Sequence, residues 1–161
     1  MTTVGYAMLE YSRYKHARFS ARFPKDYRYS LSHYWMALVD REQGIWRVGF
    51  TKFATRMLGE LVEADFEVPV GGAIASGQEI GWVEGFKAAS NVYSVIDGEF
   101  LGMNPILAED ACIIRSSPYE DGFLYEAKGS PEANALDVSG YEAHLDSLIA
   151  EMEKDPKYAD E

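Results

Sequence analysis

Hydrophobic and polar positions alternate in short runs along most of the chain, a spacing that is typical of β-strands. Between Tyr34 and Val48, two apolar runs flank the polar segment 40–44, so this region predicts a hairpin of two antiparallel strands. Further strands are predicted at residues 60–67, 73–74, 79–84, 89–95 and 99–103. Turn-forming residues separate these runs at 69–72, 76–77, 85–87 and 97–98. The rhythm indicates a compact β-sandwich or flattened barrel.

Two segments have the spacing of helices instead. Thr51 is a predicted N-cap for a helix of about two turns, which Gly59 is placed to end. Near the C-terminus, Ser139 and Glu142 have the spacing of a capping box. The apolar residues that follow recur at helical intervals: Tyr141, Leu145, Leu148, Ile149 and Met152. We therefore expect a short internal helix and a C-terminal amphipathic helix, both packed on the sheets.

The chain of 161 residues, 47% of them hydrophobic, is long enough for one core and short for two full domains. We divide it into a basic N-terminal extension at 1–30, a main domain at 31–153 and a charged tail at 154–161. The extension has six Lys or Arg and two acidic residues, whereas the whole chain has a net charge of −11. Its aromatic residues are Tyr6, Tyr11, Tyr14, Phe19, Phe23, Tyr27 and Tyr29. Because so many aromatic side chains are costly to expose, we expect the extension to fold onto its own domain, with contact to a partner as the alternative.

Composition and charge argue against several function classes. The net charge of −11 disfavours nucleic acid as a partner, since phosphate binding depends on clustered Lys and Arg. No apolar run reaches the roughly 20 residues that span a bilayer, and the N-terminus lacks the apolar core of a secretory signal. We therefore expect a soluble, cytoplasmic protein with no membrane partner. Cys112 is the single cysteine and is expected to be buried, and His16, His33 and His144 lack the spacing of a metal site or hydrolytic triad.

One turn contains the candidate functional residue. The segment Glu84-Gly85-Phe86-Lys87-Ala88 joins two predicted strands, so Lys87 lies at the tip of a hairpin and its amine projects into solvent. By itself, this pattern does not distinguish a modified lysine from an ordinary solubilising charge. The distinction comes from the sequence around it.

From His33 to Leu148, the sequence resembles the H protein of the glycine cleavage system. The family's Glu-Ser-Val-Lys-Ala pattern appears here as residues 84–88. The other matching segments are Val48-Gly49-Phe50-Thr51, Leu58-Gly59-Glu60, Asn91-Val92-Tyr93, Gly98-Glu99, Asn104, Pro118-Tyr119 and Gly122-Phe123-Leu124. Lipoyl domains also place glycines sixteen residues before and eleven residues after the modified lysine, which are the positions of Gly71 and Gly98.

The resemblance implies a mostly β fold of the lipoyl/biotinyl type, a barrel-sandwich hybrid of two small antiparallel sheets. It also implies a covalent lipoyl group on Lys87 and a non-catalytic carrier that moves a group or electrons between partner enzymes. Glu84 and Gly98 resemble positions through which a lipoate ligase or lipoyltransferase recognises the hairpin. In the family, a loaded arm is shielded in a cleft on the carrier's own surface.

Several residues depart from the family pattern. Gly85-Phe86 replaces Ser-Val, Asn91 replaces an acidic residue, Arg115 replaces an asparagine, and Tyr34 replaces the glutamate of a His-Glu-Trp segment. This variant is similar to the lipoate-binding proteins of bacterial sulfur oxidation, which serve a heterodisulfide-reductase-like complex, and we favour that branch. The alternatives are an aminomethyl carrier for glycine decarboxylase, aminomethyltransferase and dihydrolipoyl dehydrogenase, and an unmodified interaction protein with the same fold.

Overall fold

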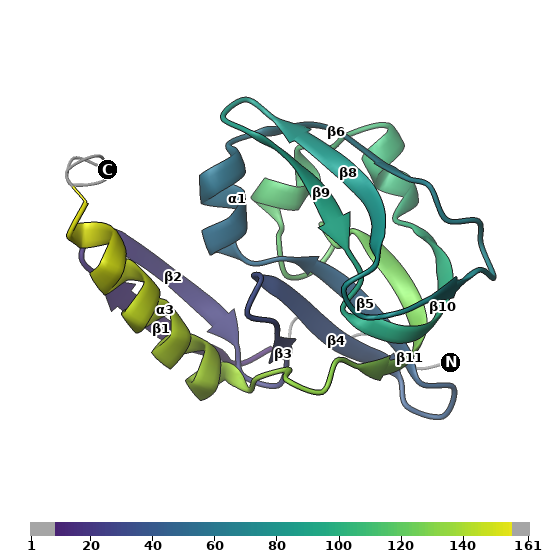
Figure 1. Cartoon of the computed structure of the whole chain (residues 1–161), viewed down its shortest axis with the longest axis horizontal. Coiled ribbons are helices and arrows are strands. Elements are labelled where there is room, and N and C mark those ends of the chain that lie inside the picture. Colours follow the sequence, from purple (N-terminus) through teal and green to yellow (C-terminus); the bar gives the residue numbers. More distant parts are fainter. Residues whose placement is uncertain (1–8, 156–161) are drawn as a thin grey trace.

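The computed structural model of the protein describes residues 9–155, in which antiparallel strands form three sheets (Figure 1). The largest sheet has the strand order β3 (Arg28–Tyr29), β4 (Tyr34–Asp40), β5 (Ile45–Phe50), β11 (Tyr125–Pro131), β10 (Ile96–Met103) and β7 (Ala73–Ile74). A smaller sheet has the order β6 (Leu61–Phe66), β8 (Glu79–Gly85) and β9 (Ala89–Tyr93). The remaining two strands, β1 (Tyr11–His16) and β2 (Phe19–Pro24), form a separate hairpin.

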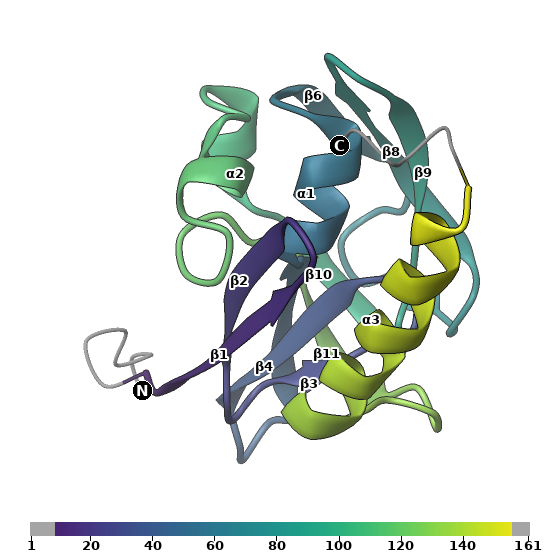
Figure 2. The same ribbon diagram turned by 90° about the vertical axis from the view of Figure 1, so that its left-hand side faces the viewer.

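Helices connect and cover the sheets. The short α1 (Lys52–Leu58) joins β5 to β6, and the 3₁₀-helix η2 (Pro105–Ala108) and α2 (Ile113–Ser116) lie between β10 and β11. The long α3 (Val138–Glu153) runs beside the β1–β2 hairpin (Figures 1 and 2). Among the helices of residues 9–155, none is both long and apolar enough to cross a membrane.

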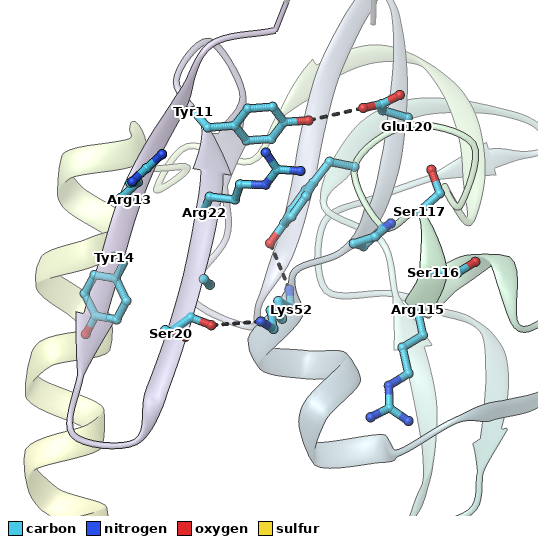
Figure 3. A pocket seen from close by; sticks show the side chains of 13 residues that line it. Tyr11, Arg13, Tyr14, Ser20, Arg22, Lys52, Arg115, Ser116, Ser117 and Glu120 are labelled. Atoms are coloured by element: carbon cyan, nitrogen blue, oxygen red, sulfur yellow. Dashed lines mark hydrogen bonds between the residues drawn. The ribbon is translucent and has the colours of Figure 1, made fainter. Parts of the chain in front are cut away.

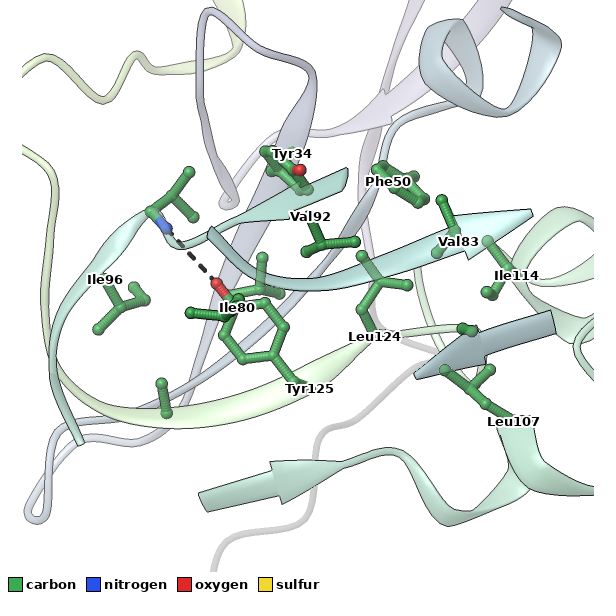
Figure 4. Packing of buried hydrophobic residues seen from close by; sticks show 14 of the residues in the cluster. Tyr34, Phe50, Ile80, Val83, Val92, Ile96, Leu107, Ile114, Leu124 and Tyr125 are labelled. Atoms are coloured by element: carbon green, nitrogen blue, oxygen red, sulfur yellow. Dashed lines mark hydrogen bonds between the residues drawn. The ribbon is translucent and has the colours of Figure 1, made fainter. Parts of the chain in front are cut away.

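The main hydrophobic core lies between the six-stranded and three-stranded sheets (Figure 4). Along β8, Ile80 and Val83 are fully buried while Glu79 and Glu84 are exposed. These two buried residues are three positions apart, because the register shifts between Glu79 and Gly81. Opposite them, the large sheet contributes buried side chains that include Val48, Ile96 and Tyr125. This mostly aliphatic core fixes the strands that present the β8–β9 turn.

A second core joins the N-terminal hairpin to the body and is rich in aromatic rings. Phe23 is fully buried, and its ring centroid lies 5.3 Å from that of Tyr141 on α3 and 6.3 Å from that of Tyr119. Tyr29 stacks on Tyr141 at 4.9 Å. The aromatic extension therefore packs on its own domain, in agreement with the sequence-based expectation, although Tyr6 lies outside the described residues.

The structure confirms the mostly β, lipoyl-type fold class and several local predictions. Strands β4 and β5 flank a turn at residues 41–44, and α1 extends from Lys52 to Leu58 between Thr51 and Gly59. The buried face of α3 includes Tyr141, Leu145 and Ile149. Of the predicted charged tail, residues 156–161 lie outside the described part of the chain.

Three local predictions are corrected by the structure. The expected turn at Asp97-Gly98 is part of β10, because the Asp97 carboxylate accepts hydrogen bonds from the backbone and hydroxyl of Ser76 rather than closing a turn. The N-cap of α3 is Asp137, whose carboxylate accepts from the backbone N–H of Gly140 at 2.8 Å, so the helix starts before Ser139. Thr51 is the N-cap of α1, but its hydroxyl bonds to Tyr141 instead of to the helix.

Candidate functional site

Lys87 lies in the turn between β8 and β9, at the free end of the three-stranded sheet (Figure 1). The register pairs Glu84 with Ala89, which leaves residues 85–88 as the tip. The side chains of Lys87 and Phe86 are exposed, and Phe86 is exposed by 78%. The tip therefore presents an amine beside an aromatic ring to any approaching molecule.

Backbone hydrogen bonds hold this tip against the end of α1. The N–H of Lys87 donates to the carbonyl of Leu58 at 2.9 Å, and that of Ala88 donates to the same carbonyl at 3.3 Å. The N–H of Phe86 donates to the carbonyl of Glu60 at 3.0 Å. A turn held by neighbouring backbone moves less than a free hairpin tip, so the lysine side chain extends from a fixed base.

Gly59 makes this close approach possible. It ends α1 with a φ of 78°, a conformation that favours glycine, and a Cβ at this position would lie 2.9 Å from Cγ of Lys87. The predicted role of Gly59 as a helix stop is confirmed. The structure adds that the absence of a side chain leaves room for the stem of Lys87.

A pocket of about 840 Å³ lies beside Lys87, between the β1–β2 turn, α1 and the end of α3. Its apolar lining residues are Ala17, Phe19, Phe53, Met57, Ala88, Ile149 and Met152. Its charged or titratable lining residues are His16, Arg18, Arg56, Lys87 and Glu153. The amine of Lys87 donates to the carbonyl of Arg56 at 3.5 Å. A long flexible group attached to this amine would have an apolar surface within reach.

A second pocket, of about 430 Å³, adjoins the first and shares Phe53, Met57 and Met152 with it. Its other lining residues are Ser32, His33, Tyr34, Phe50, Ala54, Leu58, Ser90 and Leu148, and this described lining has no carboxylate. Burial lowers the pKa of His33 to about 4, so its ring is neutral near pH 7 and its Nδ1 lies 2.8 Å from the Tyr141 hydroxyl. The second pocket is thus apolar with neutral polar groups.

The other predicted recognition residues lie at different distances from the tip. Glu84 is exposed at the end of β8, on the hairpin itself. Gly98 lies in the other sheet, where β10 passes so close to β11 that an added Cβ would collide with the backbone of Lys128 and Gly129. The structure therefore brings Glu84, but not Gly98, next to Lys87, and the recognition role of both residues stays a prediction.

Cys112 is exposed, so the expectation that it is buried is wrong. Although its neighbours Ala111 and Ile114 are buried, the cysteine stands at the N-cap of the short helix α2 and turns outward. Its thiol donates to the carboxylate of Glu60 at 3.2 Å, and this hydrogen bond raises the pKa of the thiol. A raised pKa favours the unreactive thiol form.

Sequence reasoning did not find the residues that the N-terminal hairpin adds to the pocket beside Lys87. Arg18 and Phe19 lie at or next to the β1–β2 turn, far from the lysine in sequence. The basic and aromatic composition of the extension indicated that it packs on another surface, but it did not show that this surface lies beside Lys87. Within residues 9–155, no cluster of three potential metal-binding side chains is found.

Comparisons with known proteins agree with the fold. A family model described as glycine cleavage H-protein matches residues 27–147. The glycine cleavage system H protein of Serratia proteamaculans is 35% identical over 126 residues, which cover 76% of this chain and 96% of that protein. The corresponding protein of Pectobacterium atrosepticum is 36% identical, with 76% and 95% covered.

A solved structure of an H protein is also similar to this chain. The crystal structure of a glycine cleavage system H protein from Mycobacterium marinum superposes with a TM-score of 0.69 at 28% sequence identity. The match covers 76% of this chain and 98% of that one. The β1–β2 hairpin lies before the residues that the family model matches.

Proposed function

The chain belongs to the glycine cleavage H-protein family, and from this premise we propose that it is a non-catalytic cytoplasmic carrier with a lipoyl group in amide linkage to Lys87. Its cargo in this proposal is the aminomethyl group, taken up at glycine decarboxylase and delivered to aminomethyltransferase, with reoxidation by dihydrolipoyl dehydrogenase. The observation that carries the proposal is the exposed Lys87, at the tip of a hairpin whose backbone is fixed to α1.

The surroundings of Lys87 fit a lipoyl group. When bound, this group supplies a dithiolane that exchanges electrons and a transferred group by thiol–disulfide chemistry. The exposed amine can enter the active site of a modifying enzyme, and the apolar pocket beside it offers ring and thioether surfaces from Phe53, Met57 and Met152. These features support a lipoyl-lysine at this position.

The residues around the lysine have two separate tasks in this proposal. The carbonyls of Leu58 and Glu60 hold the turn, so a partner enzyme meets the amine at a constant distance from the body. Glu84 gives the modifying enzyme an acidic contact on the same hairpin. Both tasks are positional, and the chemistry belongs to the partner enzymes.

A second candidate function follows from the smaller pocket. Its described lining has no carboxylate to pair with an ammonium group. In the neighbouring pocket, Arg18 and Arg56 stand beside a single carboxylate, Glu153, which already bonds to His16. Such surroundings favour an uncharged or anionic cargo, as in the lipoate-binding proteins of sulfur oxidation with their heterodisulfide-reductase-like partner. The comparisons give no support to this branch, so it is the alternative here rather than the favoured function.

Glycine–bicarbonate exchange tests the proposal. Fully lipoylated protein, verified by intact mass, is combined with a glycine decarboxylase, and Lys87→Ala is compared with Lys128→Ala, which removes another exposed lysine. We expect exchange with the wild type and with Lys128→Ala, and none with Lys87→Ala. Lipoylation without exchange would exclude the aminomethyl cargo and favour the sulfur-oxidation candidate, whereas a mass without lipoate in protein from its native host would exclude the carrier itself.

A further inference from the structure

A third cavity, which Lys87 does not line, lies between the outer face of the β1–β2 hairpin, the start of α1 and the segment after α2 (Figure 3). It has a volume of about 640 Å³. Its lining residues are Tyr11, Arg13, Tyr14, Ser20, Ala21, Arg22, Lys52, Arg115, Ser116, Ser117, Pro118, Tyr119 and Glu120. Three chain segments that are distant in sequence therefore contribute to one open site.

The charge of this lining is opposite to that of the protein. Arg13, Arg22, Lys52 and Arg115 face a single acidic residue, Glu120, although the chain as a whole has a net charge of −11. The basic extension supplies Arg13 and Arg22, whereas Lys52 and Arg115 come from the acidic remainder of the chain. A local excess of positive charge in an acidic protein marks a surface on which an anionic group is attracted.

The register of the hairpin places two of these cations directly opposite one another. Arg13 pairs with Arg22 across the strands, so both side chains leave the same face. Like charges in this arrangement repel and destabilise a hairpin. The guanidinium of Arg22 lies 4.5 Å from the centre of the Tyr11 ring, which orients the group without neutralising its charge.

The carboxylates around the hairpin already have hydrogen-bond partners. On the outer face, Glu120 accepts from the hydroxyl of Tyr11 at 3.2 Å, and the other carboxylates bond to the inner face. There Ser12 donates to Glu142, and Tyr14 and His16 bond to Asp146 of α3. On the outer face, no described carboxylate forms an ion pair with Arg13, Arg22 or Arg115. Among residues 9–155, these three arginines therefore have no carboxylate in an ion pair, and they are available to an acidic group that enters the cavity.

The cations are spread across the site rather than gathered around one point. Figure 3 shows Arg13 on the hairpin at one side and Arg115 beyond α1 at the other, with Arg22 and Lys52 between them. The amine of Lys52 already donates to the carbonyl of Ser20 at 2.9 Å, which ties α1 to the hairpin. A single phosphate would reach only part of this row, whereas an extended segment with several carboxylates can contact all of it.

We propose that this cavity is a docking site for an acidic, extended segment of a partner protein, held by Arg13, Arg22 and Arg115 through carboxylate contacts. The hydroxyls of Ser116 and Ser117, which also line the cavity, add neutral donors. Two of the three arginines precede the residues that match the family model. The docking site is therefore an addition to the carrier fold, and it does not depend on the lipoyl group or on the nature of the cargo.

Fluorescence anisotropy with a labelled octaglutamate peptide tests the proposal on the full-length, lipoylated protein. The double variant Arg13→Gln/Arg22→Gln is compared with Arg41→Gln/Lys128→Gln, which removes the same charge from exposed positions outside the cavity. We expect wild type and control to bind alike, and the first variant to bind about tenfold more weakly. Binding should also weaken with added salt.

A single variant outside the hairpin controls for the possibility that the double variant unfolds the hairpin. Arg115→Gln lies outside β1 and β2 and is expected to weaken binding by about threefold with an unchanged near-ultraviolet circular dichroism spectrum. Equal loss of binding in both double variants, or no binding by the wild type, would overturn the proposal. Displacement of the peptide by equimolar pyrophosphate would also overturn it, because the site would then be one for small anions.

Discussion

The two hydrophobic cores of the molecule are built from different side chains. The core between the large and small sheets is dominated by Val, Ile, Leu and Ala, whereas the core beneath the N-terminal hairpin and α3 is dominated by Tyr, Phe and Trp. In the second core the rings keep a polar end, as when the Tyr27 hydroxyl donates to the carbonyl of Tyr119 at 2.6 Å. Aliphatic side chains fill the space between the two sheets, whereas aromatic rings pack the β1–β2 hairpin against α3 and the large sheet.

The difference assigns separate roles to the two regions. The aliphatic core positions β8 and β9, and therefore Lys87, within the part of the chain that the family model matches. The aromatic core attaches a hairpin that precedes this match and that lines both the pocket beside Lys87 and the basic cavity. We expect the two regions to respond separately to mutation.

The largest expected effect comes from Phe23→Ala. Removing this fully buried ring should cost about 3–5 kcal/mol of the free energy of unfolding, because a cavity opens between the hairpin and α3. Phe100→Ala in the aliphatic core is the matched control. Urea unfolding gives the loss, and hydrogen exchange should locate it in β1, β2 and α3 for Phe23 and in the sheets for Phe100. Identical exchange maps would show that the two cores unfold as one.

A smaller effect is expected at the base of the lysine. Gly59→Ala places a Cβ in a backbone conformation reserved for glycine and against the stem of Lys87, at a cost of about 1–3 kcal/mol. Gly77→Ala is the control, since Gly77 has a φ of 85° with nothing near an added Cβ. Both variants should be less stable, but only Gly59→Ala should slow lipoylation by a lipoate ligase. Equal rates in the two variants would remove Gly59 from the positioning of Lys87.

The smallest effect is a pH dependence of the contact between the hairpin turn and α3. Hydrogen bonds from His16 to Asp146 and Glu153 raise the pKa of its ring above the usual 6.5. The charged ring therefore adds stability that is complete below pH 6.5 and is lost as the pH rises through the folded-state pKa. Denaturation at pH 5.5 and pH 8.5 should show this loss in the wild type and a smaller one in His16→Gln. The same pH profile in both would assign the dependence to other groups.

The sequence predicted most elements that rest on local pattern. The strands around residue 42, the helix between Thr51 and Gly59, and the lysine hairpin follow from alternation and turn chemistry within short windows. The pairing of β11 with β5 and β10 was not predicted, since its residues 125–131 include Gly129 and Pro131 and read weakly as a strand. Such a strand forms because the sheet on both sides supplies its partners.

The sequence predicted the lysine hairpin of the candidate site, but it did not predict which other segments line the pocket beside it. Lys87 and Glu84 are three residues apart and belong to one short motif, whereas Arg18 and Met152 reach the pocket beside Lys87 only through the tertiary fold. Cys112 shows the opposite error, because an apolar neighbourhood in sequence suggested burial while the end of a short helix turned it outward. The surroundings of Arg18, Met152 and Cys112 depend on the tertiary fold, so a local sequence pattern does not predict them.

The attachment of the hairpin tip to α1 also affects how readily proteases cleave after Lys87. Trypsin needs several residues around an exposed lysine in an extended strand, and here the amides of Phe86, Lys87 and Ala88 are bound to carbonyls of the neighbouring backbone. Cleavage after Lys87 therefore requires those hydrogen bonds to open first. Acylation of the amine would remove the positive charge that the enzyme recognises. The backbone hydrogen bonds thus protect this exposed lysine from digestion, and acylation would protect it further.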